Sequence, residues 1–312
     1  MLTPNDDFLH PPVNDDRYWT ETVWFCANVP ERKLALSFYM QFRTNMGIVC
    51  PSLWIWGPDA ENVWEIPYQR TLWYEAMPKD IDVTNFKLAS GFEIERLSPM
   101  DSYRLRYSDG DRVSVDLVYK GLSPAVPYGV ANGYGHLDQY GRVTGEIVLD
   151  GETIAVDCFD MRDRTWSPRR ETSQRARVGY AYGAASATDG FQVATKWDEA
   201  SDEDRLMLGF FLTPQGNRLI KHGTREVARD AEGRPTEVIL RLYDETGVEQ
   251  VIRGVIENRF AQPSNPYLCW MCLVRWTMPS GAVAWGQDQD TWAPAKFRDL
   301  RRDLKLAAKS PA

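Results

Sequence analysis

One short charged segment carries several of the side chains in this chain that could take part in acid–base chemistry. It reads Asp160-Met161-Arg162-Asp163-Arg164-Thr165-Trp166-Ser167-Pro168-Arg169 and directly follows a run with strand-like alternation. Guanidinium groups beside a carboxylate lower its pKa and keep it ionised, so Asp163, held by Arg162 and Arg169, is expected to act as a base or an orienting group. The alternative is a purely structural network of salt bridges, because such clusters also form without catalysis.

Histidine is the side chain best suited to proton transfer near neutral pH, and the chain has only three. His136 lies in Tyr134-Gly135-His136-Leu137-Asp138-Gln139, inside an irregular stretch from 120 to 139 that is rich in glycine and proline. Long ordered loops often border functional sites, so His136 is the candidate proton carrier. The alternative is a loop histidine that hydrogen-bonds the backbone.

Other reaction classes find little support in the sequence. Cys269 and Cys272 are three residues apart on an expected strand, so their sulfurs point to opposite faces and cannot share a zinc ion. The chain contains no phosphate-binding glycine loop, no dinucleotide fingerprint and no serine-hydrolase elbow. We therefore expect neither a metal nor a cofactor.

The composition limits the partners. A net charge of −8 over 312 residues argues against a nucleic-acid partner, which needs lysine and arginine gathered on one face. An N-terminus without a signal pattern, five cysteines and the lack of long apolar runs predict a cytoplasmic protein without a membrane span. Twelve Trp and fourteen Tyr favour a small-molecule pocket lined by aromatic rings. The oligomeric state, a homodimer included, stays open.

The elements that must position these residues are mainly strands. Apolar residues alternate with polar ones in many short segments, and Asp109-Gly110, Asp150-Gly151 and Asp189-Gly190 are typical of hairpin turns. Only 293–308 has helical spacing, with Phe297 and Leu300 on its apolar face. The sequence thus predicts an all-β protein of two packed, lipocalin-like antiparallel β-barrels with a C-terminal helix. The expected domains are 1–170 and 171–312, joined near 167–171.

The central part of the chain resembles a superfamily of double-lipocalin proteins that includes carotenoid 1,2-hydratases, AttH-like proteins and lipocalin-type Diels–Alderases. The pattern of that group is His-x-x-Gln, a hairpin glycine and then Arg-Asp-His-Ser-Trp-Gly-x-Arg. The matching residues of this chain are His136, Gln139, Arg162, Asp163, Trp166 and Arg169. Arg164 stands where the group usually has histidine, Thr165 where it has serine, and Ser167 where it has glycine. The missing histidine leaves His136 as the nearby proton carrier.

The resemblance implies two calycin-type barrels and cofactor-free chemistry on a hydrophobic isoprenoid, polyketide or aromatic molecule. The expected activity is that of a lyase (a hydratase or dehydratase), an isomerase or a cyclase. His136, Asp163 and Arg162 are the expected catalytic residues, and Tyr134, Gln139, Trp166 and Arg169 are the expected substrate-binding residues. The alternative function is a non-catalytic carrier of a hydrophobic ligand, because the fold does not decide the function.

Overall fold

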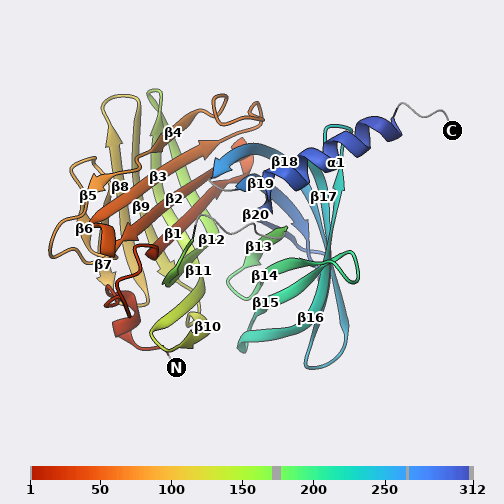
Figure 1. The fold of residues 1–312 in the computed structure, drawn as a ribbon, viewed down its shortest axis with the longest axis horizontal. Coiled ribbons are helices and arrows are strands. Elements are labelled where there is room, and N and C mark those ends of the chain that lie inside the picture. The colour runs from red at the N-terminus through yellow and green to blue at the C-terminus, as the bar shows by residue number, and fades with distance from the viewer. Residues whose placement is uncertain (1, 171–176, 265–266, 309–312) are drawn as a thin grey trace. The chain divides into compact units, whose positions relative to one another are not determined.

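A computed structural model describes residues 2–170, 177–264 and 267–308 (Figure 1). The chain divides into two compact units, and each is described by itself. Unit 1 comprises Met1–Trp56 and Pro67–Arg170, and unit 2 comprises Gly57–Ile66 and Glu171–Ala312. The domain bounds 1–170 and 171–312 stay a prediction, and residues 171–176 of the expected junction lie outside the described residues.

Unit 1 is built on one antiparallel sheet of 12 strands that curls into a half-barrel. Its strands follow the order β4-β3-β2-β1-β12-β11-β9-β8-β7-β6, while β5 pairs with β3 and β10 with β11. Their bounds are β1 (Trp19–Val29), β2 (Leu34–Arg43), β3 (Ile48–Trp56), β4 (Tyr68–Thr71), β5 (Glu75–Ala76), β6 (Phe86–Lys87), β7 (Glu93–Ser98), β8 (Ser102–Asp109), β9 (Val113–Gly121), β10 (Val126–Ala131), β11 (Tyr134–Leu149) and β12 (Glu152–Pro168). Three short 3-10 helices lie at Pro4–Asp7, Pro30–Arg32 and Thr44–Met46.

The two faces of this sheet differ. The inner face carries the hydrophobic core of unit 1, to which Val23, Phe25 and Phe38 belong, and the opposite side is called the outer face below. Within the predicted lipocalin-like architecture, this sheet is open, with β4 and β6 at its edges. Near this opening, side chains connect two strands that are not paired. The hydroxyl oxygens of Tyr68 on β4 and Tyr107 on β8 lie 2.7 Å apart.

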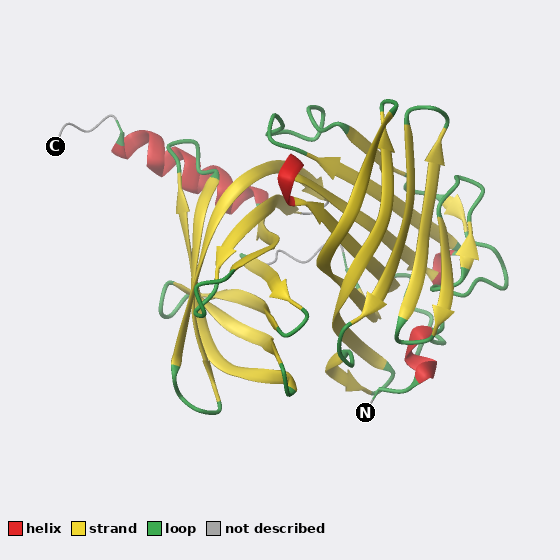
Figure 2. Cartoon of the chain, turned by 180° about the vertical axis from the view of Figure 1, so that it is seen from behind, coloured by secondary structure: helices red, strands yellow, loops and turns green. Residues whose placement is uncertain are grey.

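Unit 2 contains a closed antiparallel barrel of eight strands, β13 to β20, followed by one helix. The predicted all-β class with a C-terminal helix is therefore confirmed, and strands dominate the view in Figure 2. The bounds are β13 (Val178–Ser186), β14 (Asp189–Asp198), β15 (Glu203–Thr213), β16 (Gly216–Arg229), β17 (Pro235–Asp244), β18 (Glu249–Ser264), β19 (Tyr267–Thr277), β20 (Val283–Trp292) and α1 (Pro294–Ala307). Among the described residues, no helix combines the length and the apolar character that a membrane crossing requires.

Charged side chains occupy part of the inside of this barrel. Arg225 is fully buried and donates to both oxygens of Asp288, at 2.9 and 2.6 Å, and to Asp204 at 2.9 Å. Asp290 lies 3.2 Å from Arg225 and 2.8 Å from Arg229. These ion pairs and an apolar cluster pack the barrel interior, as side chains do in small barrels.

The two cysteines of the Cys269-Trp270-Met271-Cys272 segment are both buried and unlinked. Cys272 belongs to the hydrophobic cluster of unit 2, whereas the Cys269 sulfur lies 3.4 Å from the Thr291 hydroxyl. Burial raises the pKa of the Cys269 thiol to about 12, and it also raises the pKa of Cys272. Both groups therefore stay protonated thiols at neutral pH, which suits packing and not nucleophilic chemistry.

Two of the three hairpin turns predicted from the sequence are present in the structure, and one is not. Asp150 and Gly151 connect β11 to β12 with φ values of 49° and 84°, the left-handed pair that a tight hairpin requires. Gly110 likewise has a positive φ between β8 and β9. The prediction for Asp189-Gly190 was wrong, because both residues begin β14 and the turn consists of residues 187 and 188.

Candidate functional site

The candidate residues lie on β11 and β12, two long paired strands of unit 1. His136 is opposite Thr165 in this pairing, Asp138 is opposite Asp163, and Gln139 is opposite Arg162. Successive residues of a strand point to opposite faces, whereas directly opposed residues share one face. The strand pairing therefore sends His136 and Asp163 to the outer face and Arg162 to the inner face.

The outer face holds a compact cluster of His136, Asp138, Asp163 and Thr165. The His136 ring is held at both nitrogens, with Nε2 3.0 Å from an Asp138 oxygen and Nδ1 2.8 Å from the Thr165 hydroxyl. Asp138 is fully buried, while 22% of the His136 side chain remains exposed. A histidine between a carboxylate and a hydroxyl has a fixed orientation, and its protonation is coupled to the neighbouring charges.

The acids and the histidine shift each other's proton affinity. Burial raises the pKa of Asp163 to about 6, with the nearby Asp138 carboxylate adding to the shift and His136 opposing it. Burial by itself would lower the pKa of His136, but the Asp138 and Asp163 carboxylates outweigh it and the pKa is raised. The Asp163 carboxyl therefore titrates near pH 6, beside a histidine that holds its proton more tightly than a free imidazole does.

Asp163 carries a carboxylate oxygen that the described residues leave without a hydrogen-bond partner. Its Oδ1 is buried and accepts no hydrogen bond within the part of the chain that the structure describes. Both nitrogens of His136 already contact protein oxygens. A carboxylate oxygen without a partner carries a desolvation cost, which a bound hydroxyl group or a proton removes.

Aromatic side chains surround the cluster on the outer face. Trp24 on β1 is directly opposite Asp163, and the Tyr128 ring lies 6.0 Å from that of His136. Arg169 donates to Thr165 and to the Tyr39 hydroxyl, both at 3.0 Å. The neighbourhood thus combines apolar ring surfaces with an oriented acid–base cluster, a combination common in small-molecule sites.

The inner face carries a different network, which anchors the N-terminal segment. Arg162 donates to Asp7 at 3.1 Å and to the side-chain oxygen of Gln139 at 2.7 Å, and its guanidinium lies 4.5 Å from the centre of the Tyr103 ring. Tyr103 and the backbone NH of Met100 also donate to Asp7. All of Arg162 and Asp7 is buried, so this ion pair is part of the interior packing and not of the outer-face site.

Arg164 extends the inner-face network toward the N-terminal arm. It donates to Glu21 at 2.6 Å and to the backbone oxygen of Asp7 at 2.8 Å. The Glu21 carboxylate also contacts the His10 ring at 3.2 Å, and that ring stacks on Trp166 with 4.1 Å between centres. Arg164, which stands where the double-lipocalin group usually has histidine, is therefore a buried side chain that holds residues 7–10 in place.

The predicted set of site residues is thus divided between the two faces. His136 and Asp163 come together, and Arg169 acts on Asp163 by its charge while bonding Thr165. The prediction that Arg162 holds Asp163 was wrong, because neighbours on a strand point apart. Gln139 and Trp166 lie on the inner face with Arg162, and Tyr134 packs near Trp19 with 5.8 Å between ring centres.

The expected loop around His136 was also wrong. Asn132 and Gly133 have φ values of 54° and 80° and form the turn of a hairpin between β10 and β11, which makes His136 a strand residue. Asn-Gly between alternating segments is a strong hairpin signal that the sequence already contained. Recognising this turn places His136 and Asp138 on one face of the strand. Sequence reasoning could therefore have identified Asp138 as a neighbour of His136.

The cluster also has the spacing of a metal site. One ligand atom each from His136, Asp138 and Asp163 can be chosen so that all three lie within 4.8 Å of one another. A histidine and two carboxylates suit a divalent cation such as Mn²⁺ or Fe²⁺. The sequence predicts no metal, and the chelation experiment described below tests that expectation.

Residues 3–278 match the model of a family described as a domain of unknown function, DUF7064. No curated protein matches the sequence. Among solved structures, a putative AttH from Nitrosomonas europaea has a TM-score of 0.55 at 12% identity, with coverage of 88% of this chain and 92% of that chain. Kievitone hydratase from Nectria haematococca has a TM-score of 0.57 at 11% identity, with coverage of 93% and 94%. CghA has a TM-score of 0.57 at 10% identity, with coverage of 88% and 87%. The predicted likeness in fold to AttH-like proteins is confirmed, and at these identities the matches establish the fold alone.

Proposed function

We propose a cofactor-independent lyase or isomerase activity on a hydrophobic small molecule for this chain, which belongs to the DUF7064 family. The observation that carries the proposal is the Asp163 carboxyl, with a pKa of about 6 and an unpartnered Oδ1 beside His136. A carboxyl with a pKa of about 6 populates both protonation states around neutral pH, so it can take up a proton in one direction of a reaction and return it in the other. Kievitone hydratase, a structural relative, is a hydratase by name.

In this proposal Asp163 exchanges the proton with the substrate, and His136 is a positioning residue that sets the proton affinity of Asp163. Asp138 orients the histidine ring through the 3.0 Å contact. Trp24, Tyr39 and Tyr128 provide the apolar surface for an isoprenoid, polyketide or aromatic substrate. Arg162 is left out of the chemical step, because it lies on the opposite face of the sheet.

A panel of hydrophobic alkenes and tertiary or β-hydroxy compounds, incubated with the protein in H₂¹⁸O and D₂O, tests this function. We expect mass spectrometry to detect ¹⁸O in hydrated products and deuterium at the adjacent carbon, equally with and without EDTA. Loss of turnover on chelation, with recovery on adding Mn²⁺ or Fe²⁺, would assign the cluster to metal chemistry. Ligands that bind and return unlabelled favour the carrier function instead.

The pH dependence distinguishes positioning by His136 from simple packing. In His136→Gln we expect the pKa of Asp163 to rise above about 6, because the protonated ring that opposes the shift is gone while the Asp138 charge stays. Carboxyl ¹³C NMR follows this titration, and Asp163→Asn assigns the signal. Arg142→Gln, an exposed substitution on the same strand, is the control that leaves the pKa unchanged. An unchanged or lower pKa in His136→Gln contradicts the assignment.

A further inference from the structure

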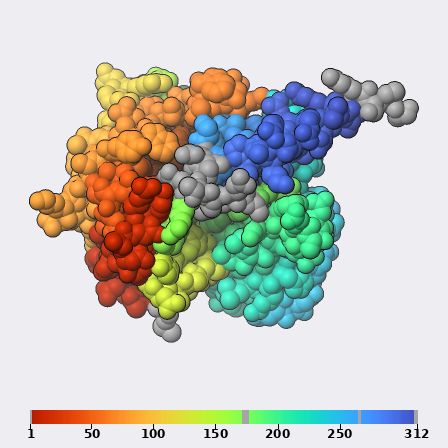
Figure 3. Space-filling model, in the orientation of Figure 1, coloured from red at the N-terminus to blue at the C-terminus, as the bar shows by residue number. Residues whose placement is uncertain are grey.

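Helix α1 carries a local excess of positive charge on an acidic protein. The segment 294–308 contains five basic residues, Lys296, Arg298, Arg301, Arg302 and Lys305, and two acidic ones, Asp299 and Asp303. Its formal charge is therefore 5 − 2 = +3, whereas the whole chain has −8. In Figure 3 the helix lies on the visible surface of unit 2.

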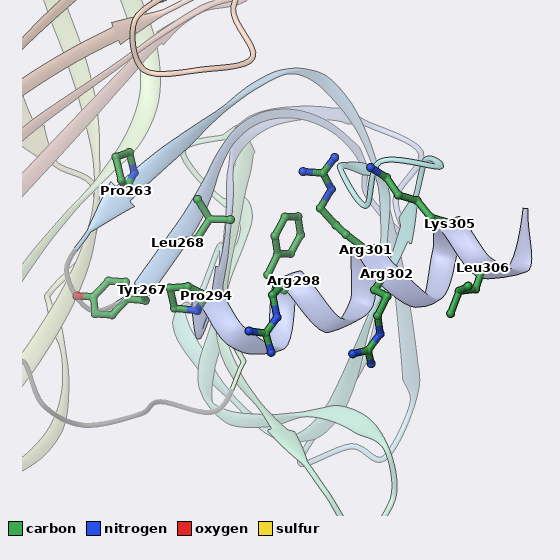
Figure 4. A pocket seen from close by; sticks show the side chains of 10 residues that line it. Pro263, Tyr267, Leu268, Pro294, Arg298, Arg301, Arg302, Lys305 and Leu306 are labelled. Atoms are coloured by element: carbon green, nitrogen blue, oxygen red, sulfur yellow. The ribbon is translucent and has the colours of Figure 1, made fainter.

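A groove of about 740 Å³ lies between this helix and the β18–β19 end of the barrel (Figure 4). The side chains of Pro263, Leu268, Phe297 and Leu306 provide its apolar surface, together with the ring of Tyr267. Phe297 is 7% exposed and packs edge-on against Trp270 and Trp292. The floor of the groove is thus fixed to the barrel core, and its volume is in the range of small-molecule sites.

Four cations border the same groove. Arg298, Arg301, Arg302 and Lys305 follow the i, i+3 and i+4 spacing of neighbouring residues on a helix surface. In Figure 4 Arg301 and Lys305 extend to one side of the helix axis, and Arg298 and Arg302 extend to the other. The Arg298–Asp299 and Arg302–Asp303 pairs are solvent-exposed and contribute little, so an external anion can replace them. Arg301 pairs with Glu232, and Arg302 also lies 3.7 Å from Asp299, whereas no ion pair of Lys305 is found within the described residues.

We propose that this groove binds a single-chain amphipathic anion, an acyl carboxylate of the fatty-acid type. The chain would lie along Leu268, Phe297 and Leu306, and the carboxylate would meet the cations of the helix. An apolar floor with a basic rim matches an anion that has an apolar tail, whereas a neutral or cationic amphiphile gains nothing from the rim. A membrane surface fits less well, because the largest apolar side chain of the helix, Phe297, already packs into the barrel.

Fluorescence titration of the full chain with 11-(dansylamino)undecanoic acid tests the proposal. We expect saturable binding of one molecule and an affinity about ten-fold lower in the double variant Arg302→Gln/Lys305→Gln. Lys296→Gln is the matched control, since it removes an exposed charge from the same helix outside the groove lining. Asp163→Asn should bind as tightly as the unmodified chain, which separates this site from the proposed acid–base site.

Two further measurements distinguish the occupant. Dodecylamine should fail to displace the probe, while dodecanoate should displace it. Equal affinity in the double variant and in Lys296→Gln overturns the proposal, as does displacement by dodecylamine at the concentration that dodecanoate requires. Co-sedimentation with phosphatidylglycerol vesicles, in a protein that does not bind the monomeric probe, would overturn it in favour of a membrane contact.

Discussion

Asp163→Asn is expected to reduce turnover by about 10²–10⁴-fold, the usual contribution of a general acid–base group. The amide has nearly the shape of the carboxyl but cannot exchange a proton with the substrate. Because Asp163 makes no hydrogen bond through its buried Oδ1, the substitution disturbs few native contacts. Substrate binding should change much less than the rate constant of the chemical step.

The same substitution should stabilise the protein above neutral pH. The pKa of Asp163 is raised in the folded chain, from 3.8 to about 6, so the folded state binds the proton more tightly than the unfolded state. Stability is therefore lost as the pH rises from about 4 to about 6, and the ionised carboxylate costs about 1–3 kcal/mol at higher pH. Asparagine removes this cost.

Thermal unfolding at pH 4 and pH 8, combined with turnover, checks both effects. We expect the Tm of Asp163→Asn to exceed that of the unmodified protein by a few degrees at pH 8, with the difference disappearing near pH 4. Asp157→Asn is the control, since Asp157 is an exposed residue of the same strand and its pKa is lowered by Arg142. Full turnover in Asp163→Asn would exclude Asp163 from the reaction.

Arg225→Met is expected to destabilise unit 2 by about 3–5 kcal/mol, because it leaves buried carboxylates without their main counterion. Asp288 is the most affected, since both of its oxygens accept from Arg225. Burial already raises the pKa of Asp288 despite the arginine, so removal of Arg225 should raise it further. The variant should accordingly regain stability as the pH falls, when Asp288 takes up a proton.

Urea unfolding of Arg225→Met, monitored by tryptophan fluorescence, measures the loss of stability. The double variant Arg225→Met/Asp288→Asn should recover part of the stability, because the carboxylate that lost its partner is gone. Arg205→Met on the neighbouring strand is the control, and its exposed ion pairs with Asp198 and Glu203 predict a change within about 0.5 kcal/mol. If Arg225→Met and Arg205→Met lose the same free energy of unfolding, the buried ion pairs of Arg225 do not stabilise unit 2.

The division of charged residues between the two faces of the unit 1 sheet separates a buried ion-pair network from the proposed acid–base site. Arg162 and Arg164 hold the N-terminal arm from the inner face, through Asp7 and Glu21. Asp163 and Thr165 alternate with them along the same strand and belong to the outer-face cluster. One short segment of sequence thus supplies both a buried anchor and the proposed acid–base group.

The sequence by itself determined the all-β class and the C-terminal helix, because these follow from local periodicity, and residue type singled out His136 and Asp163 as candidates. The alternation of side chains along a strand also predicts that Arg162 and Asp163, as successive residues, point to opposite faces of the sheet. The same argument places the sulfurs of Cys269 and Cys272 on opposite faces. Only the tertiary structure decided that unit 1 remains an open sheet, because closure depends on the pairing of edge strands far apart in the chain. It also decided that Asp7 and Glu21 pair with Arg162 and Arg164. The pKa of about 6 at Asp163 results from burial and from charges on other strands, which no local pattern encodes.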